Sequence, residues 1–282
     1  MALLLGVLVA ASFGSGDFLG GRASRRAPTL TVLFVAQIAA VAGAALVCAF
    51  VGAHVAPHDI AFGALAGSFN IIGIGLLYQG LAVGRMGVVA PLTAVVSSMV
   101  PIAWGVANGE RPSAIVVLGV LFALVAGALI SRASGEHASA GAGDSAVAWA
   151  VGAGVCLGTS LVLYAQTSSD SGMWPVFTAR AAAFVLVALA LLFVAVRRVA
   201  LPFPAAADRR LAISAGVLDV TASALLLLAV RRGLLVVVAP LAALAPAATV
   251  LLARVVLHEH LHPIQRVGLV LALLGIVLIV AG

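Results

Sequence analysis

Residues 88–92 read Val-Val-Ala-Pro-Leu, and the same five residues return at 237–241. At this offset of 149 residues, Glu110 also falls on Glu259. Further identical pairs at the same offset are Gly119 with Gly268 and Ala123 with Ala272. Chance similarity between helices rich in Ala, Val and Leu would repeat apolar residues, but not a Pro, a Gly and a Glu at one offset. The sequence therefore predicts an internal duplication.

The composition places both copies in a membrane. Of the 282 residues, 64% are hydrophobic and 9% are charged, and the mean hydropathy is +1.26. A soluble domain is about 45–50% apolar and about 25% charged, so this chain could not cover a globule with a wettable surface. At about 20 residues per spanning helix, the length allows roughly ten crossings and no soluble domain. That excludes a tethered soluble enzyme and a nucleic-acid-binding domain, although the net charge is +6.

The apolar runs between charges, Pro and Gly divide the chain into ten predicted membrane helices. Their approximate spans are residues 3–21, 29–52, 60–83, 87–107, 113–131, 146–165, 174–195, 211–230, 234–254 and 262–281. The first is expected to be a retained helix and not a signal peptide, because no basic region precedes it and the apolar stretch runs on. The polar stretch 132–145 is expected to be a flexible linker between a first repeat, 1–131, and a second, 146–282.

Five helices in each half have a topological consequence. Because five is odd, the second copy enters the membrane from the opposite side to the first. Two halves of opposed topology can enclose one central site and expose it alternately to each side. The predicted fold class is therefore all-α and integral to the membrane, with ten transmembrane helices in two inverted five-helix repeats. The predicted function is secondary transport of a small solute.

Short motifs recur in a recognisable order along the chain. Each half has Ala-Pro-Leu at the start of its fourth helix and a short Glu-containing loop before its fifth, and the first helix contains Gly14-Ser15-Gly16-Asp17-Phe18. With Thr178-Ala179-Arg180 in the seventh helix, this order resembles the EamA family of the drug/metabolite transporter superfamily over essentially the whole chain. The resemblance implies a helical bundle with a central cavity that moves small metabolites such as amino acids, or drugs, across a bacterial inner membrane. It implies no covalent step, no enzyme activity and no cofactor.

Three charged residues fall inside the predicted helices: Asp17, Arg180 and Asp219. A charge at mid-bilayer costs roughly 2.5–3.5 kcal/mol on insertion scales, so such residues usually face a cavity or a partner. Arg180 could hold a solute carboxylate or a counter-acid. Asp17 or Asp219 could bind a solute amine or exchange a proton, because a dry site favours the neutral carboxyl group. The alternative is an Arg180–Asp pair that only ties helices together.

Neutral polar residues complete the candidate site. Gln37 and Asn70 lie well inside predicted helices and are expected to line the cavity, and Gln37 occupies the position in the first half that is equivalent to Arg180. Tyr78 and Gln79 approach a helix end, where an interfacial role is at least as strongly expected.

The stretch His258-Glu259-His260-Leu261-His262 matches the HExxH pattern of zinc proteases. The alternative function is therefore an intramembrane enzyme that uses His258, Glu259 and His262, or a membrane protein that transports nothing. However, Pro263 belongs in the first turn of the last helix, which leaves the preceding residues in a loop and not on the helix that zinc requires. No catalytic residue and no metal site are expected. Glu110 and Glu259 are expected to be structural acids near helix N-termini.

The expected partners are a small-molecule solute and the lipid bilayer, with proton coupling as an option and with no nucleic acid. The expected location is the cell inner membrane, crossed many times. Most loop arginines follow odd-numbered helices, which favours those loops as cytoplasmic and both termini outside. The resemblance implies the opposite orientation, so both orientations stay open, as do the solute and the oligomeric state.

Overall fold

The computed structural model describes residues 2–50, 56–84, 86–107, 142–231, 245–257 and 263–281, together with short pieces between 109 and 129. Every regular element in these ranges is a helix. The α-helices are α1 (Ala2–Ser24), α2 (Thr29–Phe50), α3 (Pro57–Val83), α4 (Met86–Ala107), α6 (Ala142–Ala165), α7 (Trp174–Val196), α8 (Ala206–Arg231), α10 (Ala245–Val256) and α11 (Pro263–Ala281), and a 3₁₀ turn, η1, covers Ser169–Ser171.

Several of these helices have the length and composition of membrane spans. By both criteria α2, α3, α7 and residues 145–165 of α6 could each cross a bilayer. Helices suit lipid because all their backbone hydrogen bonds are made within one segment. The prediction of an all-helical fold is therefore confirmed for the described residues, and the length and composition of these four helices are consistent with a membrane protein.

Two helices, α6 and α8, begin four or more residues before their predicted starts. The last residues of the predicted linker 132–145 are helical, since α6 already begins at Ala142. In the same way, α8 begins at Ala206 and not at residue 211. Asp208 falls in its first turn, where an acid interacts favourably with the positive end of the helix dipole, so the helix extends into a polar stretch that hydropathy alone excludes.

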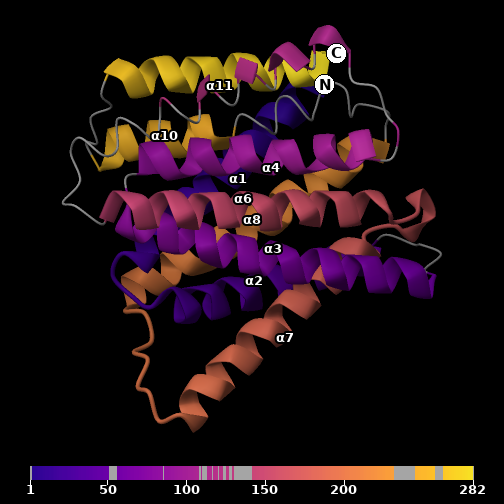
Figure 1. Ribbon diagram of the computed structural model, residues 1–282. Coiled ribbons are helices and arrows are strands. Elements are labelled where there is room, and N and C mark those ends of the chain that lie inside the picture. The colour runs from indigo at the N-terminus through magenta and orange to yellow at the C-terminus, as the bar shows by residue number, and fades with distance from the viewer. Residues whose placement is uncertain are drawn as a thin grey trace.

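The helices interleave across the two halves of the sequence. The closest packing joins α1 with α8, α3 with α6 and α7, α2 with α8 and α7, and α4 with α6, whereas helices that follow one another touch little. Most helices run side by side, and α7 crosses them obliquely and leaves the bundle at its far end (Figure 1). The core is therefore built mainly between helices that are distant in sequence.

Two glycines let helix backbones meet at equivalent places. Gly67 of α3 lies directly against the backbone of Ala179 in α7, and Gly216 of α8 lies against the backbone of Ala36 in α2. Gly67 and Gly216 are 149 residues apart, the offset of the duplication. Small residues at such crossings permit the close approach on which helix association in lipid depends.

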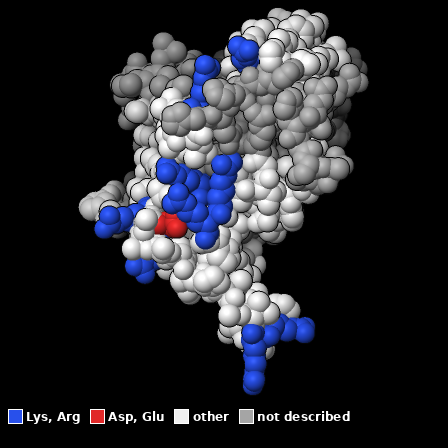
Figure 2. All heavy atoms as spheres, turned by 90° about the vertical axis from the view of Figure 1, so that its left-hand side faces the viewer, with Lys and Arg blue, Asp and Glu red and all other residues white. Residues whose placement is uncertain are grey.

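Arginine side chains gather at one end of the bundle (Figure 2). Exposed arginines at and next to the ends of α1, α7 and α8 are Arg25, Arg26, Arg197, Arg198, Arg209 and Arg210. Two of them also hold helix ends, because Arg25 donates to the carbonyls of Leu81 (3.1 Å) and Gly84 (3.2 Å), and Arg26 lies 3.8 Å from Asp208. This end carries the loops after α1 and α7, which the positive-inside rule favours as cytoplasmic.

At the other end of the bundle, a buried acid anchors the loop between α6 and α7. Asp59, in the first turn of α3, is 1% exposed. Its carboxylate accepts hydrogen bonds from the backbone N–H of Ser168 (2.7 Å), the Ser168 hydroxyl (2.9 Å) and the Ala56 N–H (3.2 Å). Asp59 therefore caps its own helix and fixes a loop more than a hundred residues away.

We expect the Asp59→Ala variant to unfold at a temperature several degrees below that of the wild type. Hydrogen bonds to a charged group contribute about 1.5–3 kcal/mol each, and the substitution leaves the Ser168 donors without their acceptor. The measurement is thermal unfolding of the purified protein in detergent, followed by tryptophan fluorescence. Asp170→Ala, an exposed acid in the same loop, is the matched control. Equal melting temperatures for the two variants would show that the loop is held by other contacts.

Candidate functional site

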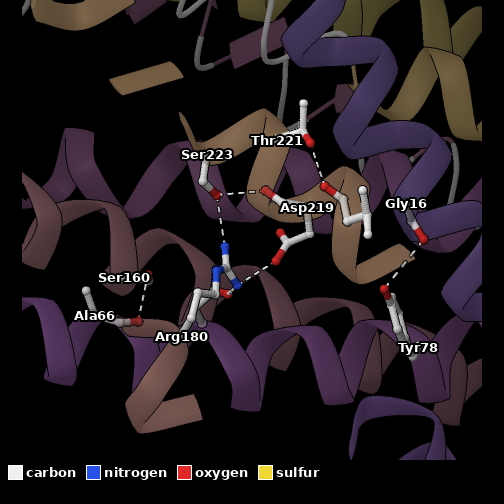
Figure 3. Close-up of polar contacts among 10 residues, drawn as sticks. Gly16, Ala66, Tyr78, Ser160, Arg180, Asp219, Thr221 and Ser223 are labelled. Atoms are coloured by element: carbon white, nitrogen blue, oxygen red, sulfur yellow. Dashed lines mark hydrogen bonds and ion pairs between the residues drawn. The ribbon is translucent and has the colours of Figure 1, made fainter. Parts of the chain in front are cut away.

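An ion pair inside the bundle joins α7 to α8, and a side chain of α3 lies beside it. Arg180 Nη1 is 2.5 Å from Asp219 Oδ2, and the two side chains are only 3% and 16% exposed (Figure 3). Both residues were predicted as site candidates from their charge inside apolar segments. The structure brings them into direct contact.

Further groups surround the Arg180 guanidinium. Nη1 donates to Asn70 Oδ1 at 3.2 Å, and Nη2 donates to the Ser223 hydroxyl at 2.9 Å. The Ser223 hydroxyl donates in turn to the backbone carbonyl of Asp219 (2.9 Å), one helical turn earlier in α8. Arg180 Nε is buried and has no hydrogen-bond partner. Asn70 was predicted as a site residue, whereas Ser223 was missed, because hydroxyl groups inside membrane helices are common and carry little signal.

Asp17 lies beside this pair without joining it. Its neighbour Gly16, in α1, packs against Ala215 and Leu218 of α8, which places Asp17 at the level of Asp219. The two carboxylates are close enough to repel each other. Asp17 is half-buried and makes no ion pair or hydrogen bond with any side chain in the described part of the chain.

Gln37 reaches the same level of the bundle from α2. The preceding residue, Ala36, lies against Gly216, one turn before Asp219, just as Ala179 lies against Gly67, one turn before Asn70. Gln37 is 3% exposed, and its Oε1 atom has no hydrogen-bond partner. The predicted candidates Asp17, Gln37, Asn70, Arg180 and Asp219 therefore lie in one layer across the bundle, which we call the polar layer.

The polar layer contains two related pairs of positions. Asn70 and Asp219 are separated by the duplication offset of 149 residues, and both contact Arg180. Gln37 is the counterpart of Arg180. The second half thus supplies a charged pair, Arg180 with Asp219, where the first half supplies two neutral amides, Gln37 with Asn70.

Two tyrosines border the polar layer. Tyr78 is 4% exposed, and its hydroxyl donates to the Gly16 carbonyl at 3.5 Å (Figure 3). Of the two roles left open for Tyr78, the interfacial one does not fit this burial, because α1 and α3 pack closely enough there to enclose the ring. Tyr164, at the end of α6, lies within electrostatic range of Arg180 and Asp219.

Other predicted features lie elsewhere. Glu110, His258, Glu259 and His262 fall outside the described residues, so the HExxH stretch has no structural account. Among the described residues, no group of three His, Cys, Asp or Glu could hold a metal ion. A hollow of about 240 Å³ lies between α2 and α7 and not in the polar layer. Its lining consists of Ala45, Cys48, Ala49, Trp174 and Phe177.

Comparison with known proteins agrees with this architecture. A crystal structure of another protein is similar over 98% of this chain and 95% of its own, with a TM-score of 0.64 and 16% sequence identity, so the two share a fold. No curated protein matches the sequence. Residues 144–281 match the model of the EamA-like transporter family. The second half of the chain, which contributes Arg180 and Asp219, therefore belongs to the EamA-like transporter family of the drug/metabolite transporter superfamily.

Proposed function

We propose that this multi-pass membrane protein is a secondary transporter that carries a small metabolite or drug across the bacterial inner membrane through the polar layer. The observation that supports this most is the buried Arg180–Asp219 pair with Asn70 beside it. Charges cost several kcal/mol inside a bilayer, so they usually mark a solute or ion pathway. The family of the second half consists of transporters, which fits a protein that is not an enzyme.

The polar layer contains buried hydrogen-bonding groups that have no partner. Buried polar groups in folded proteins nearly always have partners. Here Arg180 Nε and Gln37 Oε1 have none, and Asp17 is not neutralised by a basic side chain. A solute, or water that a solute displaces, would satisfy these groups. If the ion pair only tied helices together, that role would not explain why unpaired polar groups lie beside it.

The pattern of helix packing supports ten spans in two inverted repeats. If α1, α2 and α3 correspond to α6, α7 and α8, the contact of α1 with α8 becomes that of α6 with α3, and the contact of α2 with α8 becomes that of α7 with α3. All four contacts are extensive. Gly67 and Gly216, which are 149 residues apart, show the same exchange, because Gly67 of α3 meets α7 and Gly216 of α8 meets α2.

The mechanism we infer is alternating access. Helices of the two halves would rock about the polar layer and open it to one side of the membrane at a time, with no covalent step. Asp17 has no basic partner among the described residues, which makes it the acid best placed to exchange a proton for the solute. Asp219 and Tyr78 are the ionisable groups within electrostatic range of Asp17.

Counterflow in proteoliposomes tests the transport function. Radiolabelled amino acids and amines, supplied one at a time, should enter vesicles faster when the vesicles are preloaded with the same unlabelled compound, at a rate that saturates. A channel would show neither saturation nor this acceleration. Vesicles that take up no probe faster than protein-free vesicles would contradict the proposal.

The Asn70→Leu variant should lower the counterflow rate about tenfold. One hydrogen bond to a charged group contributes about 1.5–3 kcal/mol, and Asn70 positions Arg180 without balancing its charge. Ser68→Ala is the matched control, because the Ser68 hydroxyl bonds only to the carbonyl of Ala64 in its own helix. Equal rates for Asn70→Leu and Ser68→Ala would exclude Asn70 from the pathway.

A further inference from the structure

We infer that the polar layer selects solutes that carry an ammonium group over carboxylates and over neutral molecules; this rests on the transport function proposed above and assigns its solute class. Charge balance supports the inference. Within the described residues, the charged side chains of the layer are Asp17, Arg180 and Asp219. Arg180 and Asp219 form an ion pair, so Asp17 remains as one negative charge without a counter-charge. A cation bound in the layer would supply the missing positive charge.

Arg180 is poorly available to a solute carboxylate. Its Nη1 atom is engaged by Asp219 and Asn70, and its Nη2 atom by Ser223. A carboxylate would have to displace Asp219 from the guanidinium, and it would also be repelled by Asp17. Selection against a wrong ligand by uncompensated charge is a common basis of specificity. The layer therefore disfavours anions although it contains an arginine.

The hydrogen-bonding groups point to the same class. Two acceptors of the layer are unfilled, the Asp17 carboxylate and the buried Gln37 Oε1 atom. A primary ammonium group has three N–H donors and no acceptor, so it could donate to both. A quaternary ammonium group carries the charge without the donors. Gln37 is therefore assigned as the residue that distinguishes these two kinds of cation.

Four probes that share a phenyl ring test the inference: benzylamine, benzyltrimethylammonium, benzyl alcohol and benzoate. Binding is measured as the rise in melting temperature of the full-length wild-type protein in detergent over a range of probe concentrations. Benzylamine should bind most tightly, the quaternary ion less tightly, and the alcohol and benzoate at least about tenfold more weakly than benzylamine, the factor expected for one charged hydrogen bond.

Two variants assign the preference to residues. Asp17→Asn should weaken benzylamine binding about tenfold to a hundredfold, and Gln37→Leu about threefold to tenfold, while Gln37→Leu should leave benzyltrimethylammonium unchanged. Asp170→Asn and Gln166→Leu, which change the same residue types at exposed positions, are the controls. If Gln37→Leu acted only by disturbing the structure, it would weaken the binding of benzylamine and of benzyltrimethylammonium equally.

A converse experiment examines Arg180. In Asp219→Asn the guanidinium loses its counter-charge, so the variant should melt at a lower temperature than the wild type, and benzoate should raise its melting temperature more than that of the wild type. If benzoate has the same effect on both proteins, Asp219 does not withhold Arg180 from anions and the inference is wrong.

Two further results would overturn the inference: benzoate or benzyl alcohol binding the wild type as tightly as benzylamine, or no binding by any of the four probes. These outcomes are separable from a failure of the transport function. Binding in detergent requires no transport, so a protein that prefers ammonium but gives no counterflow would contradict only the transporter proposal. A protein that transports carboxylates by counterflow would contradict only the ammonium preference.

Discussion

The Arg180→Gln variant should fold poorly and transport nothing, and adding Asp219→Asn to it should restore folding but not transport. Removing one partner of a buried ion pair costs about 3–5 kcal/mol, because it leaves the other charge without compensation. Replacing both partners by neutral groups is often nearly neutral. The double substitution gives the second half the same Gln and Asn that the first half has at Gln37 and Asn70. Folding is measured as the yield of monodisperse protein and its melting temperature, and transport as counterflow.

Arg197→Gln, at the exposed end of α7, is the control for loss of an arginine. The comparison separates the two interpretations of the Arg180–Asp219 pair. A double variant that folds and still transports at the wild-type rate would make the pair a helix tie with no part in transport. A double variant that remains as unstable as Arg180→Gln would mean that the ion pair itself, and not the absence of an unpaired charge, stabilises the bundle.

A single methyl group at Gly67 or Gly216 should disrupt the bundle and displace the polar layer. A Cβ atom at Gly67 would overlap the Ala179 backbone, and one at Gly216 would overlap the Ala36 carbonyl. Backbone cannot move aside as a flexible side chain can, so we expect at least the 1–3 kcal/mol that overpacking typically costs. Gly67→Ala should also separate Arg180 from Asn70. Melting temperature and counterflow are both expected to fall.

Gly152→Ala is a demanding control for these variants. A Cβ at Gly152 would meet only the tip of the Leu76 side chain, at 3.3 Å, and Ala is favoured over Gly in a helix by about 1 kcal/mol. This variant should therefore be as stable as the wild type or more stable. If Gly67→Ala and Gly216→Ala melt at the same temperature as Gly152→Ala, the close crossings do not stabilise the fold.

Much of this architecture could be predicted from local sequence. Apolar runs bounded by charges and Pro located α1 to α4, α7 and α11 to within a few residues, because in lipid a helix must satisfy its own backbone. The start of α11 at Pro263 was predicted from the preference of Pro for the first helical turn. The start of α8 was not, because hydropathy does not register an acid that stabilises a helix N-terminus.

Pairwise contacts could be predicted only in part. Charge cost identified Arg180 and Asp219 as candidates, but no local pattern indicates that they touch. The offset of 149 residues, extended upstream, would have paired Asn70 with Asp219. It would also have paired Asp59 with Asp208, the two buried acids at helix starts. The role of Tyr78 stayed open in the sequence because distance from a helix end says nothing about which neighbouring helix covers a ring.

The interleaving of helices also constrains how the protein is made. Gly16 packs against Ala215, about 200 residues later in the chain, so at roughly 5–20 residues per second a ribosome needs about 10–40 s to supply the partner of α1. During that time Asp17, Gln37 and Asn70 have entered the bilayer or the translocon without the helices that enclose them. The first half must therefore wait as a loosely assembled set of helices until α8 is inserted. Proteases and insertion factors that act on unassembled membrane helices should encounter the nascent protein during this interval.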